Sequence, residues 1–160
     1  MYKLLLFIMF SVIWTSLFAL QTEEEVAMQT LFRAKHGLNR ATHAASLQLD
    51  QAKLAQGVAS IDEDAALLAA MRYLQANLRL DEHNVPLSDS FLRDRVEVLT
   101  FEVVNEDRMF PYTYANAQFG YSVLLRHPAV VMVVRVSFPR LFGMLEPIEW
   151  ELKSASELVW

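Results

Sequence analysis

The feature that most constrains this chain is its apolar N-terminal segment. Residues Leu4 to Leu20 carry no charge, and the only polar side chains within the run are those of Ser11, Thr15 and Ser16. A helix needs about 17 to 25 mostly apolar residues to cross the hydrocarbon core of a bilayer, so this run is just long enough. Lys3 precedes the run and can extend its ammonium group to the lipid headgroups. The run is therefore predicted to be a transmembrane anchor.

A cleaved signal peptide is the alternative reading of residues 1–21. Secretory signals carry an apolar core of about 7–15 residues, followed by a cleavage site of the small-x-small type. The best such site ends at Ala19, but the bulky Leu17 occupies the position two residues before it. Because the run also exceeds the usual signal core, we favour an uncleaved anchor. A buried core helix fits least, since the run has no polar face.

The charges on either side of the run predict its orientation. Lys3 lies before it, whereas Glu23, Glu24 and Glu25 follow it. Positively charged flanks stay on the cytoplasmic side of a membrane. We therefore expect the N-terminus inside the cell and residues 22–160 as one extracytoplasmic domain at the cytoplasmic membrane, whether or not the segment is cleaved. With no cysteine in the chain, no disulfide stabilises that domain.

Composition argues against a nucleic-acid partner. The chain has a formal net charge of −5, with acidic and basic residues interspersed and no basic block. Proteins that bind a duplex or an anionic membrane surface usually present a basic face. The remaining length is enough for a single domain with its own core.

A long helix with one stripe of small residues follows the apolar run. Apolar side chains recur every three or four residues, as on one buried helix face; they are Leu31, Ala34, Leu38, Ala41, Ala45, Leu49, Ala52, Ala55 and Ala59. Thr22 and Glu25 fit a capping box, so either a new helix begins there or one helix continues out of the membrane. The helix is expected to reach about Ala55 and to end at Gly57. Gly37 is a candidate site for a bend.

A second helix and a sheet are predicted after Gly57. Ser60 and Glu63 fit another capping box, and the apolar pattern beyond them predicts a helix to about Leu80. The period then changes from about 3.6 to 2, which indicates strands at 96–104, 119–126, 129–138 and 147–153. Short links favour an antiparallel meander. The predicted fold class is α+β, in which a long N-terminal helix and a second helix pack on a four-stranded antiparallel β-meander.

The sequence contains no motif that predicts catalysis or metal binding. His36 and His43 lie seven residues apart, whereas two metal ligands on one helix usually lie three or four apart. The acidic run 62–64 is explained by the start of a helix. There is no G-x-S-x-G motif, no cysteine nucleophile and no glycine-rich phosphate loop. We therefore expect no enzyme, no metal and no cofactor.

Two features remain as candidate partner interfaces. The first is a stripe on the long helix that either seats the chain's own sheet or lets a neighbouring helix approach closely, because small residues permit close packing; its residues are Leu31, Ala34, Leu38, Ala41 and Ala45. The second is an aromatic loop at 109–114, where Tyr112 and Tyr114 offer flat apolar rings with polar tips. This loop either meets a partner or folds over the open end of the core.

The arrangement of these features resembles the pilin architecture, in which an apolar segment runs into a long helix that is followed by an antiparallel sheet. Residues 31–45, LFRAKHGLNRATHAA, resemble the helix after the membrane segment in TadE-like minor pseudopilins of tight-adherence pili. In that family a run such as Leu38-x-x-Ala41-x-x-Ala44-Ala45 follows the anchor. The resemblance covers about residues 4–55 and implies a membrane-anchored structural subunit, with no functional residue carried over.

These observations lead to two hypotheses of function. The first is a pilin-like or pseudopilin-like structural subunit of a bacterial surface or secretion assembly, which contacts protein partners or other copies through its alanine-rich helix. The alternative is a membrane-tethered extracytoplasmic binding or sensor module without catalytic activity. Its loops around 110–114 and 141–146 would then meet a ligand or a partner protein.

Overall fold

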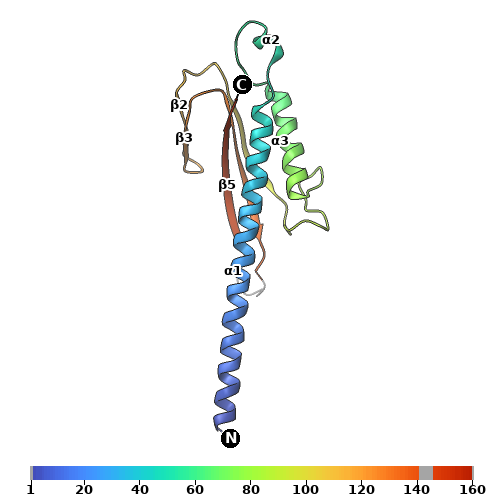
Figure 1. Cartoon of the computed structure of the whole chain (residues 1–160), viewed down its shortest axis with the longest axis vertical. Coiled ribbons are helices and arrows are strands. Elements are labelled where there is room, and N and C mark those ends of the chain that lie inside the picture. Colours follow the sequence, from blue (N-terminus) through green and yellow to red (C-terminus); the bar gives the residue numbers. More distant parts are fainter. Residues whose placement is uncertain (1, 141–145, 160) are drawn as a thin grey trace.

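In the computed structural model, which describes residues 2–140 and 146–159, the chain is a helical rod with a folded domain at one end (Figure 1). The rod is part of α1 (Tyr2–Ser46), a single helix of 45 residues. The domain adds two helices and five strands: α2 (Gln51–Leu54), α3 (Glu63–Leu78), β1 (Glu97–Val104), β2 (Tyr112–Asn116), β3 (Tyr121–Leu125), β4 (Ala129–Phe138) and β5 (Ile148–Glu157). The predicted α+β class with a long N-terminal helix is confirmed.

The helix α1 passes through Thr22 without a break and ends at Ser46, earlier than the predicted end near Ala55. Thr22 does not cap a new helix, because its hydroxyl donates to the carbonyl oxygen of Phe18 one turn back, at 2.9 Å. Backbone pairing after Ser46 explains why α1 ends early. The Asp50 N–H donates to the Ser60 carbonyl oxygen at 3.0 Å, so the chain after α1 is extended and paired with the chain before α3.

Aspartates begin the two shorter helices. The Asp50 carboxylate accepts hydrogen bonds from the backbone of Ala52 and Lys53 at the start of α2. Asp62, rather than the predicted Ser60, caps α3 by accepting from the Ala65 N–H at 2.9 Å. After Leu78, the left-handed Arg79 closes α3 close to the predicted end at Leu80.

The strands do not form the predicted four-stranded meander. They form a three-stranded antiparallel sheet in the order β1-β4-β5 and a separate antiparallel hairpin of β2 and β3. Strand β4 matches the predicted 129–138, and it lies at the centre because β1 and β5 pair with its two edges. The predicted loop at 109–114 is in part strand β2, which pairs with β3 from Tyr112 opposite Leu125 to Asn116 opposite Tyr121.

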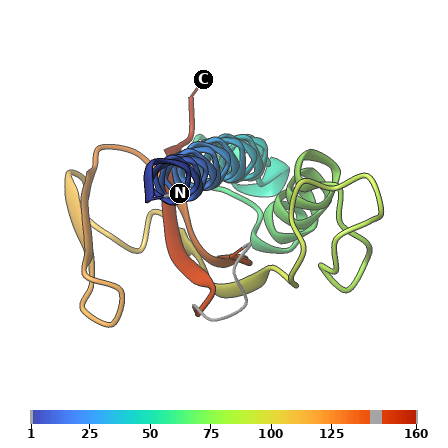
Figure 2. The same cartoon turned by 90° about the horizontal axis from the view of Figure 1, so that it is seen from below.

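The apolar sequence of β4 explains why the hairpin stays outside the sheet. Alternate side chains of β4 point to opposite faces, and from Ala129 to Val134 both sets are apolar. Val130 and Met132 belong to the main core beneath α1 and α3, whereas Ala129 and Val131 belong to a second core that includes Tyr114 and Leu125 of the hairpin. A strand that is apolar on both faces needs cover on both. The hairpin supplies part of the second cover, and Figure 2 shows it on the side of α1 away from α3.

Candidate interaction surfaces

The predicted stripe on α1 faces the interior of the chain's own domain. Ala34, Leu38, Ala41 and Ala45 are each 0% exposed, and the half-buried Leu31 packs against the same core. The opposing side chains come from α3 and the three-stranded sheet. In this chain the stripe therefore seats the chain's own elements, and a contact between these residues and a second molecule stays a prediction.

Polar side chains join the same part of α1 to β5. The hydroxyls of Thr42 and Ser154 lie 2.8 Å apart, and the Ser46 hydroxyl donates to that of Ser156 at 3.1 Å. Nearer the rod, the Lys35 ammonium donates to the carbonyl oxygen of Lys153. Burial lowers the pKa of Lys35, because removing the ammonium from water disfavours its charged form. These contacts fix the sheet against the helix.

Gly37 sets how closely α1 and α3 approach. A Cβ added at Gly37 would lie 2.6 Å from Cδ2 and 3.3 Å from Cγ of Leu78, which is fully buried. Any larger residue at position 37 would meet this side chain. Gly37 was a candidate site for a bend. It instead lies within one continuous helix, at the point where α1 packs closely against α3.

Among the described residues, one helix is long and apolar enough to cross a membrane, and it is α1. No residue in the most apolar window of α1 is buried against the rest of the chain. The length and composition are those of a membrane span, although a signal sequence or a core helix satisfies the same criteria.

A stripe of large apolar side chains runs along the exposed side of α1, and we call it the outer stripe. Its members recur at three- or four-residue intervals on either side of the polar stretch 21–25; they are Phe7, Phe10, Trp14, Phe18, Met28 and Phe32. Met28 is 47% exposed and Phe32 is 56% exposed, although both lie beyond the apolar run. At 1.5 Å per residue, Phe32 lies about 18 Å past Leu20.

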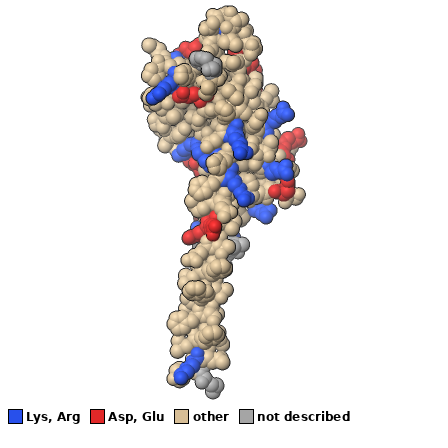
Figure 3. Space-filling model, viewed as in Figure 1, with Lys and Arg blue, Asp and Glu red and all other residues tan. Residues whose placement is uncertain are grey.

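A groove of about 380 Å³ opens beside α1 on the folded domain, and we call it the basic groove. It is lined by Arg33, His36, Gly37 and Arg40 of α1, together with Asn77 of α3 and Phe91. The Arg40 guanidinium donates to the Asn77 Oδ1 at 3.1 Å. Figure 3 shows basic side chains gathered on this part of the domain, above acidic side chains near the start of the bare rod.

Sequence reasoning missed the basic groove. It weighed His36 only as half of a histidine pair with His43. The spacing of Arg33, His36 and Arg40 was an available signal, because residues three and four apart share a helix face. Nothing in the sequence indicated that Asn77 and Phe91 would complete the lining.

The two tyrosines of the predicted aromatic loop have different surroundings. Tyr114 is 5% exposed, and its hydroxyl donates to the Glu102 Oε1 of β1 at 2.7 Å. Burial, with this hydrogen bond, raises the pKa of Tyr114 to about 12. Tyr112 is half-buried, with the Arg108 guanidinium 5.5 Å from its ring centre. Except for Glu146, the other predicted loop, 141–146, lies outside the described residues.

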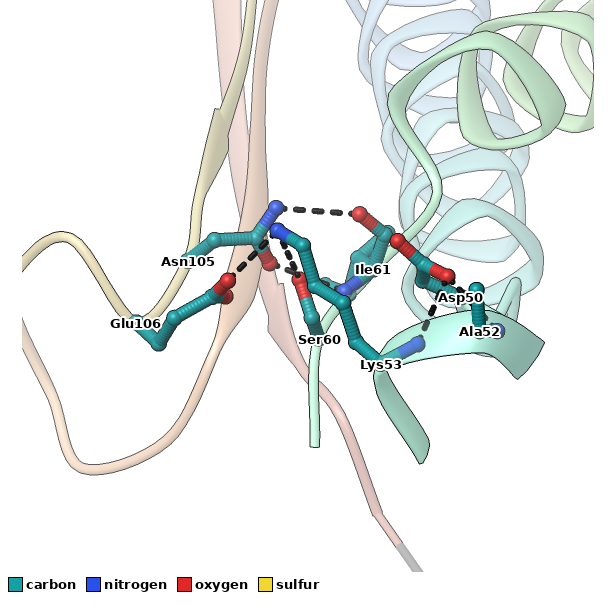
Figure 4. Close-up of polar contacts among 7 residues, drawn as sticks. All are labelled: Asp50, Ala52, Lys53, Ser60, Ile61, Asn105 and Glu106. Carbon is teal, nitrogen blue, oxygen red and sulfur yellow. Dashed lines mark hydrogen bonds and ion pairs between the residues drawn. The ribbon is translucent and has the colours of Figure 1, made fainter. Parts of the chain in front are cut away.

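A cluster of polar contacts joins the turn after β1 to the segment around α2 (Figure 4). Figure 1 shows α2 at the end of the domain away from the rod. The Lys53 ammonium lies 2.5 Å from the Glu106 Oε1 and donates to the Ser60 hydroxyl at 3.3 Å. Mainly through the hydrogen bond from Lys53, the pKa of Glu106 is lowered to about 2. Beside this pair, Asn105 hydrogen-bonds to the backbone of Ile61. The cluster links elements of one chain.

In the part of the chain that the structure describes, no group of three or more histidine, aspartate or glutamate side chains is placed to hold a metal ion. His36 lies in the basic groove, whereas the His43 Nδ1 lies 3.4 Å from the Ser156 hydroxyl. The two histidines therefore have different surroundings.

In comparisons with models of known families, with curated proteins and with solved structures, nothing matches this chain.

Proposed function

We propose that this protein is a membrane-anchored structural subunit of a bacterial surface or secretion assembly, of the pilin-like or TadE-like pseudopilin kind. Residues 1–21 anchor it in the cytoplasmic membrane with the N-terminus inside, and residues 22–160 form the extracytoplasmic domain. Its work is packing, and it has no catalytic role.

The outer stripe is the observation that carries this proposal. Lipid chains can cover Phe7 to Phe18 within the membrane, but Phe32, about 18 Å past Leu20, lies above the bilayer. Exposed apolar side chains that continue one line from a span into solvent favour contact with another helix. Such a contact would run along α1 on the side away from its own sheet.

The buried stripe alone is a poor test of assembly. Ala41→Leu and Ala45→Leu would remove a contact with a neighbour, but each would also overfill the chain's own core. Loss of co-purification in these variants would then have two explanations. Exposed residues of the outer stripe avoid this problem.

Single cysteines test the proposal directly, because the chain has none of its own. Phe32→Cys should form disulfide-linked multimers in native membranes under mild oxidation. Gln118→Cys, at an exposed position on the β2–β3 turn, is the matched control and should stay monomeric. The same Gln118→Cys variant should react with a membrane-impermeant maleimide on intact spheroplasts. Protection of its thiol until the membrane is lysed, or absence of multimers from Phe32→Cys, would contradict the proposal.

The alternative is a tethered binding or sensor module that uses the region around Phe110–Tyr114. One observation favours it: Met109, just before this region, is 91% exposed. A flexible apolar side chain at such a position suits contact with a partner protein. Met109→Ser should then lose a partner that the Phe32→Cys variant retains.

A further inference from the structure

We propose that the basic groove binds an acidic segment of a partner protein, whose carboxylates pair with Arg33 and Arg40. The groove combines three basic side chains on one face of α1 with an amide from α3 and an aromatic wall from Phe91. This goes beyond packing through the outer stripe, because it names a second surface and the chemistry of what it takes.

The charges in the groove are unbalanced within the chain. Some arginines elsewhere meet acids: Arg79 lies 2.8 Å from Asp89, and Arg135 lies among Glu97, Glu149 and Glu151. Across residues 2–140 and 146–159, neither Arg33 nor Arg40 has an acidic oxygen within 4.0 Å. The chain as a whole carries a net charge of −5. The groove is thus a local positive site on an acidic protein, which favours an anionic occupant.

The geometry suits carboxylates on a peptide. The hydrogen bond to Asn77 orients the Arg40 guanidinium before any ligand arrives, which reduces the entropy lost on binding. A guanidinium fork matches the two oxygens of a carboxylate. Gly37 has no side chain, so it adds no bulk to the groove lining. The half-buried ring of Phe91 gives the methylene groups of an acidic side chain an apolar surface.

Height above the membrane argues against lipid headgroups as the occupant. Arg33 lies 13 residues after Leu20, or about 20 Å along the helix, whereas headgroups extend about 5–8 Å past the hydrocarbon core. This step rests on the proposed anchor. A nucleic acid would need a wider basic surface than one groove.

The acidic stretch 23–25 of a second copy anchored at the same depth is not placed to fill the groove. Its exposed Glu25 would lie eight residues, or about 12 Å, below Arg33 of the first copy. In two parallel anchored copies, Glu25 of one copy therefore does not reach Arg33 of the other. A separate acidic chain has no such constraint.

Fluorescence anisotropy on the full chain in a neutral detergent tests the proposal without depending on its orientation in the membrane. The probe is a fluorescein-labelled oligoglutamate peptide, with an oligolysine peptide as the negative control. At about 50 mM NaCl, where screening is weak, we expect saturable binding of oligoglutamate alone that weakens as salt is raised. The double variant Arg33→Gln/Arg40→Gln should bind at least about tenfold more weakly.

The matched control is Arg72→Gln/Arg126→Gln, which removes the same charge from exposed sites outside the groove and should bind like wild type. Circular dichroism checks that both double variants stay folded. Asn77→Ala leaves both arginines in place, so it should weaken binding less than Arg33→Gln/Arg40→Gln does. Equal weakening in both double variants, or no saturable binding by wild type, would overturn the proposal. Groove-dependent binding of phosphatidylglycerol vesicles but not of oligoglutamate would also overturn it, as would self-association that requires Arg33 and Arg40.

Discussion

The side-chain amide of Asn105 pairs with both backbone groups of Ile61. Its Oδ1 accepts from the Ile61 N–H at 2.8 Å, and its Nδ2 donates to the Ile61 carbonyl oxygen at 2.9 Å. Asn105 is 8% exposed and Ile61 is 2% exposed, so water does not readily replace either bond. One side chain at the end of β1 thereby supplies the hydrogen bonds that a neighbouring strand would otherwise give to the segment before α3.

The first prediction is that Asn105→Ala destabilises the domain by about 2–4 kcal/mol, because it leaves two buried backbone groups without partners. Urea denaturation in detergent, followed by circular dichroism, measures this loss. Gln118→Ala, at an exposed position, is the control and should change stability by less than about 0.5 kcal/mol. If Asn105→Ala unfolds at the same urea concentration as wild type, the pairing with Ile61 contributes nothing.

The second prediction concerns the closest approach of α1 and α3. Gly37→Val should destabilise by about 1–3 kcal/mol, because its side chain meets the buried Leu78 in a filled core. His36→Val, at the neighbouring exposed position, tests helix propensity alone and should cost less than about 0.5 kcal/mol. Thermal melts of the two variants in parallel decide the question. If Gly37→Val melts at the same temperature as His36→Val, the side chain of Leu78 moves aside freely.

The third prediction is a pH dependence at the Lys53–Glu106 pair. The pKa of Glu106 is lowered to about 2, mainly by the hydrogen bond from Lys53. A carboxyl group with a lowered pKa stabilises the fold above its ordinary pKa of 4.5, and that contribution is lost as pH falls through about 2. Both side chains are more than a third exposed, so screening keeps the contribution small.

Wild type should therefore be slightly more stable than Glu106→Gln at neutral pH, and the difference should shrink between about pH 4.5 and 2. Denaturation curves of both proteins across this range measure it. Glu82→Gln, at an exposed turn, is the control and should track wild type. A difference that grows on acidification would contradict the proposed pairing.

Local patterns were sufficient to predict the long N-terminal helix, although not its end, and to predict α3 and strand β4. The uncharged run up to Leu20, the spacing of small residues from Leu31 and the valines of β4 each depend on residues near one another in sequence. Asp62, which caps α3, lies within two residues of the predicted cap at Ser60. The valines of β4 are buried, and the strand lies at the centre of its sheet.

The features that sequence did not predict arise from contacts between distant residues. The end of α1 at Ser46 depends on pairing between Asp50 and Ser60, which no helical pattern reveals. The separation of the β2–β3 hairpin depends on which face of β4 it covers, and short links alone favour a meander. The basic groove needs Asn77 beside Arg40, which are 37 residues apart. Each of these is a question of tertiary packing.

The last prediction separates the two readings of the aromatic loop through Tyr114. Tyr114→Phe removes one hydrogen bond to Glu102 and should cost about 1 kcal/mol. Tyr114→Ala also empties part of the second core and should cost about 3–5 kcal/mol. Tyr112→Ala should cost less, because Tyr112 is only half-buried.

Titration adds an independent check on Tyr114. Because the pKa of its hydroxyl is raised to about 12, the neutral phenol stabilises the fold below the ordinary value of 10.0, and this contribution is lost as pH rises through about 12. Burial also raises the pKa of Tyr121, so ultraviolet absorbance of the phenolate should show late-titrating tyrosines, one fewer in Tyr114→Phe than in wild type. If instead Tyr114→Ala melts like wild type while losing a bound partner, the loop is a binding surface and not a cover for the core.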